Sequence, residues 1–186
     1  MQSTVPDNKE DFFKALETLL EERLAPEQAR NISAFARHYY AGASHEDLRE
    51  RHFEDLYGAT LSTWFFLQQR EPDNRPKVRV FNPEYEEHGW QSTHTVVEVV
   101  SPDMSFLVDS VRIELNRCGF TVHSILNTVI ASERDEQQRL IRFTPPRAEN
   151  APSTRESIIY IEVDRHSDPA MLEELRVNIL DVLTDV

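Results

Sequence analysis

The densest group of side chains that could do chemistry lies between residues 84 and 94. It contains two histidines and three glutamates: Glu84, Glu86, Glu87, His88 and His94. A catalytic zinc ion needs three protein ligands and an open position, and histidine with glutamate can supply such a set. However, the spacing matches no zinc motif, and consecutive residues of a hairpin point to different sides. We therefore expect no metal site here, and interpret the segment as a polar hairpin in which His88 and Trp90 pack against neighbouring helices.

A histidine pair and a lone cysteine are the next candidates for catalysis. His94 and His123 both fall in predicted strands, and an acid–base pair would have to reach a common substrate. In a ferredoxin-like strand order, the strand over residues 157–163 lies between theirs, so we expect the two rings not to meet. Cys118 ends an apolar helical stripe at a helix C-terminus, where the helix dipole disfavours a thiolate. We interpret it as a buried structural thiol.

A polar segment before a predicted helix could bind the carboxylate of a small molecule. Ser101, Asp103 and Ser105 precede this helix, whose first backbone N–H groups lack partners within the helix. Asp109 and Arg112 on the same helix could orient a ligand. The alternative is that Asp103 or Ser105 caps the helix, while Asp109 and Arg112 are solvated or bonded to another subunit.

The composition excludes several classes of protein. The 186 residues include 33 acidic and 20 basic ones, a formal net charge of −13, so we expect neither a nucleic-acid partner nor a membrane surface. The four glycines lie too far apart for either usual nucleotide-phosphate loop. One cysteine fits a reducing compartment, and no apolar run resembles a signal or membrane-spanning segment. The sequence predicts a cytoplasmic chain that supplies no catalytic, cofactor-binding or metal-binding residues.

Periodicity divides the chain into a helical part and a part rich in strands. Apolar stripes at helical spacing fill residues 1–71, with Asn8, Pro26 and Ser44 among the start signals. The run 71–76 (EPDNRP) breaks the last helix and marks a linker. Strand patterns follow at 77–81, 93–100, 120–131, 140–143 and 157–163, and helix patterns follow residues 106 and 168. We predict two domains, a helical one over residues 1–71 and an α+β one over residues 76–186.

The predicted α+β domain has the order β-β-α-β-β-β-α. This order contains most of a ferredoxin-like β-α-β-β-α-β domain, an antiparallel sheet with helices on one face, but its last strand is missing. We expect residues 77–81 to fill the edge beside residues 93–100. Alternation directs Val97, Ile159 and Ile161 towards the helices. The last helix pattern lacks a stop signal, which predicts that the chain is a fragment of a longer one.

Several stretches resemble the amino-terminal region of the large bacterial NAD-specific glutamate dehydrogenases. They lie between about residues 47 and 164 and include 55–59 (DLYGA), 76–83 (PKVRVFNP), 87–98 (EHGWQSTHTVVE), 106–110 (FLVDS), 114–117 (ELNR) and 119–123 (GFTVH). The resemblance implies an ACT-like domain, a ferredoxin-like module that pairs through its sheet and often binds an amino-acid regulator. It also implies that the parent enzyme oxidises glutamate with NAD at sites outside this segment.

The resemblance thus implies a non-catalytic regulatory or assembly domain. Its partners would be the rest of the enzyme, further copies bound through the sheet, and an amino-acid effector at Asp103, Ser105, Asp109 and Arg112. Typical amino-acid-binding members carry D-x-P-G-L before the first helix, where this chain has DMSFL at 103–107. Phe106 stands at the glycine position and could fill the pocket, which favours the alternative of a purely oligomerising domain. A remote alternative is a hydrolase that uses the His/Glu cluster.

Overall fold

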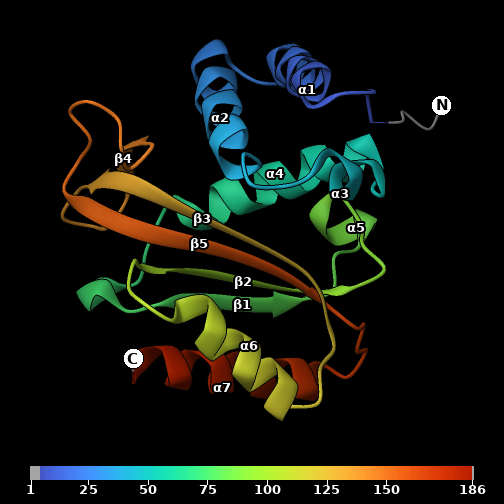
Figure 1. Cartoon of the computed structure of the whole chain (residues 1–186), viewed down its shortest axis with the longest axis vertical. Helices are drawn as coiled ribbons and strands as arrows, with labels where there is room; N and C mark the ends of the chain where they lie inside the picture. The colour runs from blue at the N-terminus through green and yellow to red at the C-terminus, as the bar shows by residue number, and fades with distance from the viewer. Residues whose placement is uncertain (1–4, 186) are drawn as a thin grey trace. The chain divides into compact units, whose positions relative to one another are not determined.

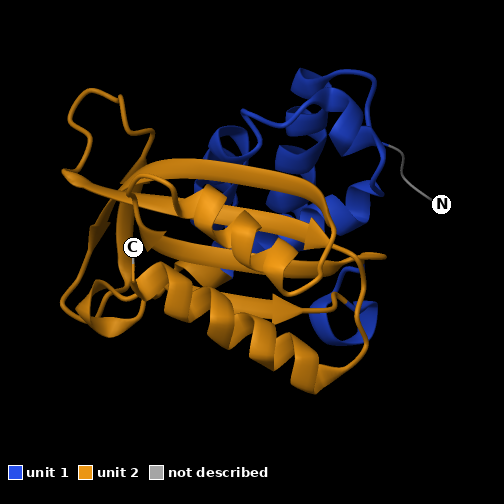
Figure 2. Ribbon diagram, turned by 60° about the horizontal axis from the view of Figure 1, so that its bottom comes forward, with its two compact units in different colours: residues 1–65, 84–91 blue, residues 66–83, 92–186 orange. Residues whose placement is uncertain are grey.

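The computed structural model of the chain describes residues 5–185 and divides them into two compact units. The first unit contains the residues up to Phe65 together with 84–91, and the second contains 66–83 and the residues from Ser92 onward (Figure 2). The chain therefore passes between the units three times. The predicted domains, 1–71 and 76–186, are defined by contiguous sequence and stay a prediction.

The helices of the first unit begin where the sequence offers start signals. They are α1 (Lys9–Arg23), α2 (Pro26–Tyr39), α3 (His45–Arg49), α4 (Phe53–Leu67, whose last two residues belong to the second unit) and the short α5 (Tyr85–His88). The Asn8 side chain accepts a hydrogen bond from the backbone N–H of Asp11, and Ser44 with Asp47 forms a reciprocal capping box. Aromatic rings join the helices: Phe12 meets Phe53 edge-on, with ring centroids 6.0 Å apart.

Residues 84–91 join the first unit through a buried tryptophan. Trp90 is 1% exposed, and its Cβ lies 2.4 Å from the position that a Cβ on Gly58 would occupy. The backbone N–H of Gln91 also donates to a side-chain oxygen of Asp55 at 3.0 Å. The prediction that Trp90 packs against a helix is confirmed, and Gly58 allows the close approach because it lacks a side chain. The predicted hairpin differs, because residues 85–88 form the helix α5.

The second unit contains a five-stranded antiparallel sheet with helices on one face, as predicted. Figure 1 shows α6 (Leu107–Arg117) and α7 (Pro169–Thr184) on the same side of the sheet. The strand order is β1-β2-β5-β3-β4, and β1 lies antiparallel beside β2, from Lys77 opposite Val100 to Phe81 opposite Val96. The predicted filling of this edge is confirmed. The strands are β1 (Lys77–Phe81), β2 (Thr95–Pro102), β3 (Val122–Arg134), β4 (Leu140–Thr144) and β5 (Thr154–Val163).

Alternation along the strands determines which side chains face the two helices. Val97, Ile159 and Ile161 join one buried apolar cluster with residues of α6 and α7, which confirms their predicted direction. Leu115 of α6 and Ile179 of α7 are fully buried in the same cluster. Helix packing therefore holds this face of the sheet.

We predict that Gly58→Ala lowers the free energy of unfolding by about 1–3 kcal/mol, because the new methyl group overlaps the Cβ of Trp90. Gly42→Ala is the matched control, since nothing lies within 4 Å of its added Cβ, and it should stay within about 0.5 kcal/mol of the unchanged chain. Urea unfolding measures both. Equal stability of the two variants would contradict the tight contact.

Candidate functional site

The predicted effector site lies in the turn between β2 and α6. Asp103 and Ser105 are exposed there. The backbone N–H of Asp103 donates to the Arg155 carbonyl at 2.9 Å, and its carboxylate accepts a hydrogen bond of 2.6 Å from the Ser157 hydroxyl. These contacts fix Asp103 to the start of β5. Asp103 is therefore an ordered, exposed anion next to the first turn of α6.

Phe106 directly precedes α6, and its backbone is left-handed. Its φ is +68°, a conformation that glycine adopts easily and other residues adopt at a cost. No side chain caps the helix, so the alternative that Asp103 or Ser105 caps it is wrong. The Phe106 side chain is 73% exposed. The expectation that its ring fills a pocket is also wrong, because the ring projects outward.

Asp109 and Arg112 form their own ion pair on the surface of α6. An Arg112 guanidinium nitrogen lies 3.0 Å from Asp109 Oδ1, and both side chains are more than half exposed. Among the residues that the structure describes, no hydrogen bond or ion pair joins this pair to Asp103 or Ser105. The role of these four residues in binding an effector stays a prediction.

The two histidines that were expected to lie apart are in contact. The strand order is as predicted, with β5 between β2 and β3, yet the His94 and His123 ring centroids lie 4.5 Å apart. The rings meet because both residues lie near the strand ends that flank Val163 of β5. His94 Nδ1 lies 3.7 Å from a Glu162 carboxylate oxygen, and Glu162 also accepts a 2.7 Å hydrogen bond from the Tyr160 hydroxyl.

In the polar segment before β2, His88 contacts its close neighbours in sequence, and its Nε2 lies 3.9 Å from a Glu87 carboxylate oxygen. His88 Nδ1 accepts a hydrogen bond from the backbone N–H of Glu84 at 3.1 Å, within the turn of α5. Across residues 5–185, no three side chains of histidine, cysteine, aspartate or glutamate are placed to hold a metal ion.

Cys118 is half-buried at the end of α6, where a fully buried thiol was expected. Burial raises the pKa of the Cys118 thiol, and its hydrogen bond to the Glu114 carboxylate raises it further. Asn178 of α7 donates to the sulfur and opposes this rise. The thiol therefore stays protonated at neutral pH, which agrees with the predicted structural role.

The second unit contains a buried ion triad formed by Glu156, Arg70 and Arg134. The Glu156 carboxylate is fully buried and accepts hydrogen bonds from Arg70 at 2.9 Å and from Arg134 at 2.8 Å. Burial acts to raise the pKa of Glu156, but the hydrogen bonds and charges of Arg134 and Arg70 outweigh it, so the pKa lies below its ordinary value. The sequence patterns did not predict this triad. The available signal was a glutamate beside the apolar run of β5.

The β2–α6 turn, where a dinucleotide loop would need glycines, carries Ser105 and Phe106. These residues do not fit a dinucleotide pyrophosphate. The structure describes no helix long and apolar enough to span a bilayer between residues 5 and 185.

The sheet order and the paired helices define a ferredoxin-like α+β domain. The family sequence model named glutamate dehydrogenase, ACT1 domain, matches residues 35–179, so the chain belongs to that family. It is 54% identical over 176 residues to the NAD-specific glutamate dehydrogenase of Halomonas elongata and 40% identical over 179 residues to that of Pseudomonas aeruginosa. These matches cover 95% and 96% of this chain but only 11% of each relative. No solved structure matches the chain. The family resemblance is thus confirmed.

We predict that Glu156→Gln lowers the free energy of unfolding by about 3–5 kcal/mol at neutral pH, because it leaves two buried arginines without their anion. The pKa of Glu156 is lower in the folded chain than in the unfolded chain. Its contribution is therefore fully present above the unfolded pKa and is lost as pH falls through the folded pKa. Urea unfolding from neutral to acidic pH should show a steeper fall for the unchanged chain than for Glu156→Gln below about pH 4.3. The control is Glu133→Gln in an exposed pair with Arg142, which should change stability by less than about 1 kcal/mol.

A second prediction concerns the strained turn. Phe106→Gly should raise the free energy of unfolding by about 1 kcal/mol, because glycine adopts the positive φ without a Cβ clash and little packing is lost from an exposed ring. Phe106→Ala keeps the Cβ and should bring no gain. Thermal unfolding of the three chains makes the comparison, and equal midpoints for the two variants would count against the strain.

Proposed function

We propose that the chain is the ACT-like part of an NAD-dependent glutamate dehydrogenase. The whole enzyme would convert L-glutamate, NAD and water to 2-oxoglutarate, ammonium and NADH. The observation that carries this proposal is the family match over residues 35–179 together with two relatives that bear this enzyme's name. The catalytic and NAD-binding residues would lie in the part of the enzyme outside this chain. The single cysteine favours a reducing, cytoplasmic location.

Within that enzyme, the proposed role of the domain is non-catalytic regulation by an amino acid bound at the β2–α6 turn. Asp103 and Ser105 are exposed next to the first N–H groups of α6, so an ammonium group and a carboxylate could both find partners there. The outward ring of Phe106 leaves the turn accessible. Asp109 and Arg112 could exchange their mutual ion pair for the two charged groups of the effector.

The competing role is assembly of the enzyme without a ligand, through the sheet or the helices. Exposed apolar side chains favour it: Phe106 is 73% and Ile113 65% exposed, both at α6. Such side chains are typical of surfaces that contact another protein surface. The partners would then be the rest of the enzyme and further copies of it.

Thermal unfolding of the chain against a panel of amino acids, with glutamate, NAD and zinc included, separates these roles. A ligand at 100 times its Kd adds about 2.7 kcal/mol. Each kcal/mol raises Tm by about 2–4 °C in a domain of this size, so an effector should raise it by about 5–11 °C. Asp103→Ala should abolish the shift, whereas Glu174→Ala, an exposed change on α7, should preserve it. No shift with any amino acid, together with a stable dimer, would support the assembly role instead.

A further inference from the structure

The sheet of the second unit has one edge that its described residues leave open. At the β4 edge, Gln69 bridges to Arg139, and the backbone N–H of Leu140 donates to the Gln68 carbonyl at 2.7 Å. At the other edge, β1 pairs with β2 alone within residues 5–185. An edge strand presents unpaired N–H and C=O groups and is a template for one more strand.

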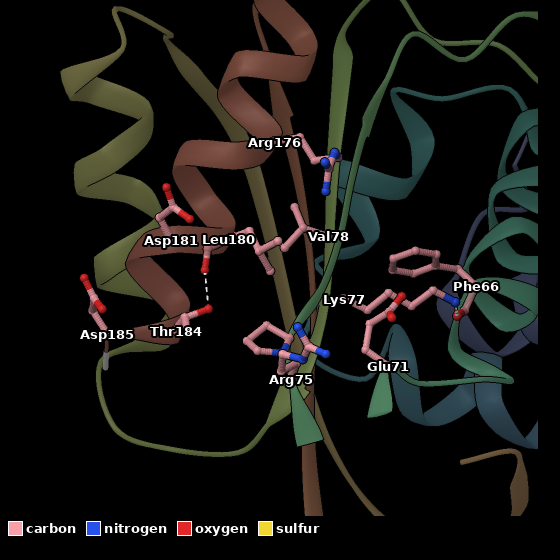
Figure 3. A pocket seen from close by; sticks show the side chains of 11 residues that line it. Phe66, Glu71, Arg75, Lys77, Val78, Arg176, Leu180, Asp181, Thr184 and Asp185 are labelled. Atoms are coloured by element: carbon pink, nitrogen blue, oxygen red, sulfur yellow. Dashed lines mark hydrogen bonds between the residues drawn. The ribbon is translucent and has the colours of Figure 1, made fainter. Parts of the chain in front are cut away.

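A hollow of about 730 Å³ lies at the open edge of the sheet, beside the first two residues of β1, Lys77 and Val78. Figure 3 shows Val78 and Leu180 on the α7 side of β1, and Phe66 and Lys77 on its other side. The hollow, which we call the edge groove, therefore passes around the rim of the sheet and not over one face. An additional strand paired with β1 would fill such a space, because its side chains alternate between the two sides of the sheet.

The charged side chains of β1 already have partners, Lys77 at and just beyond the end of α4 and Arg79 on β2, so they do not protect the strand edge against pairing. The Lys77 ammonium donates to the Phe66 and Gln69 carbonyls, each at 2.8 Å. Arg79 pairs with the Glu98 carboxylate on the neighbouring strand, and its guanidinium lies 4.4 Å from the centre of the Phe66 ring. Free lysines are one device that prevents edge-to-edge pairing, and here the lysine is bound elsewhere.

The topology gives the direction of a strand that follows α7. β2 and β3 both run antiparallel to β5, so β2–α6–β3 is a parallel crossover. Such crossovers are right-handed, and β5 runs the opposite way with α7 on the same face. A right-handed crossover through α7 must therefore move across the sheet towards β2 and β1. Because β1 occupies the place beside β2, the next position is the outer edge of β1.

The last turn of α7 reaches this position. Thr184 and Asp185 line the edge groove together with Arg75 and Lys77 at the start of β1. The chain covers only 11% of its two relatives, so most of such an enzyme lies outside the structure. We propose that the polypeptide beyond residue 186 in the full enzyme enters the edge groove and pairs with β1 as a sixth strand, parallel to it. This inference uses family membership and is independent of any regulatory ligand.

Hydrogen–deuterium exchange on the full-length enzyme and on the chain of residues 1–186 tests the proposal. Strand pairing should slow the exchange of alternate amides of Lys77–Phe81 by roughly tenfold or more in the full-length enzyme. Alternation is the signature, because only every second amide points away from β2. Uniform slowing would indicate a covering surface and would overturn the proposal, as would equal exchange in both proteins.

Two tryptophan substitutions on α7 provide the matched comparison in the full-length enzyme. Thr184→Trp places a large ring in the edge groove, whereas Glu174→Trp adds the same ring at an exposed position outside it. The first should restore fast exchange of the alternate β1 amides, and the second should leave them slow. If the β1 amides of the short chain exchange more slowly as its concentration is raised, a second copy occupies the edge, and the proposal is overturned.

Discussion

The second unit depends on one buried carboxylate. Glu156 binds Arg134 at the end of β3 and Arg70 beyond α4, and these arginines in turn donate to backbone carbonyls of the segments around residues 67–75 and 138. A buried anion without its cations is costly, so the connection after α4, the β3–β4 hairpin and the start of β5 must form together. This requirement also brings Gln69 to Arg139 and closes the β4 edge of the sheet.

Sequence patterns predicted features that depend on neighbouring residues. The start of α7 at Pro169 after Asp168 and the alternation along β2 and β5 follow from local spacing, and the structure agrees. The Glu156 triad was not predicted because its members are far apart in sequence, with 64 residues from Arg70 to Arg134 and 22 from Arg134 to Glu156. Each of them is also of a residue type that is usually found on the surface. The His94–His123 contact escaped for a related reason. Strand order tells which strands are neighbours, but the His94 and His123 rings, at the ends of β2 and β3, reach each other past the end of β5.

The β2–α6 turn keeps the backbone of a glycine turn without the glycine. Phe106 adopts a φ of +68°, so the path of the chain into α6 is the one that a glycine would favour. What differs is the surface, which carries an exposed aromatic ring beside Asp103. The exposed ring belongs neither to the buried core nor to an ion pair of this unit. A binding function at this turn could therefore be gained or lost by few substitutions.

Because residues 84–91 belong to the first unit, recombination between the two units would separate residues that pack together. Trp90 lies between β1 and β2 in sequence, yet its packing partner Gly58 lies on α4. A genetic exchange within residues 71–76 would join a new helical unit to a tryptophan that evolved to pack on a different helix surface. Lineages that recombine there would lose the fit between these two residues. The helical and sheet units are therefore expected to descend as a single block, as an interleaved pair of modules must.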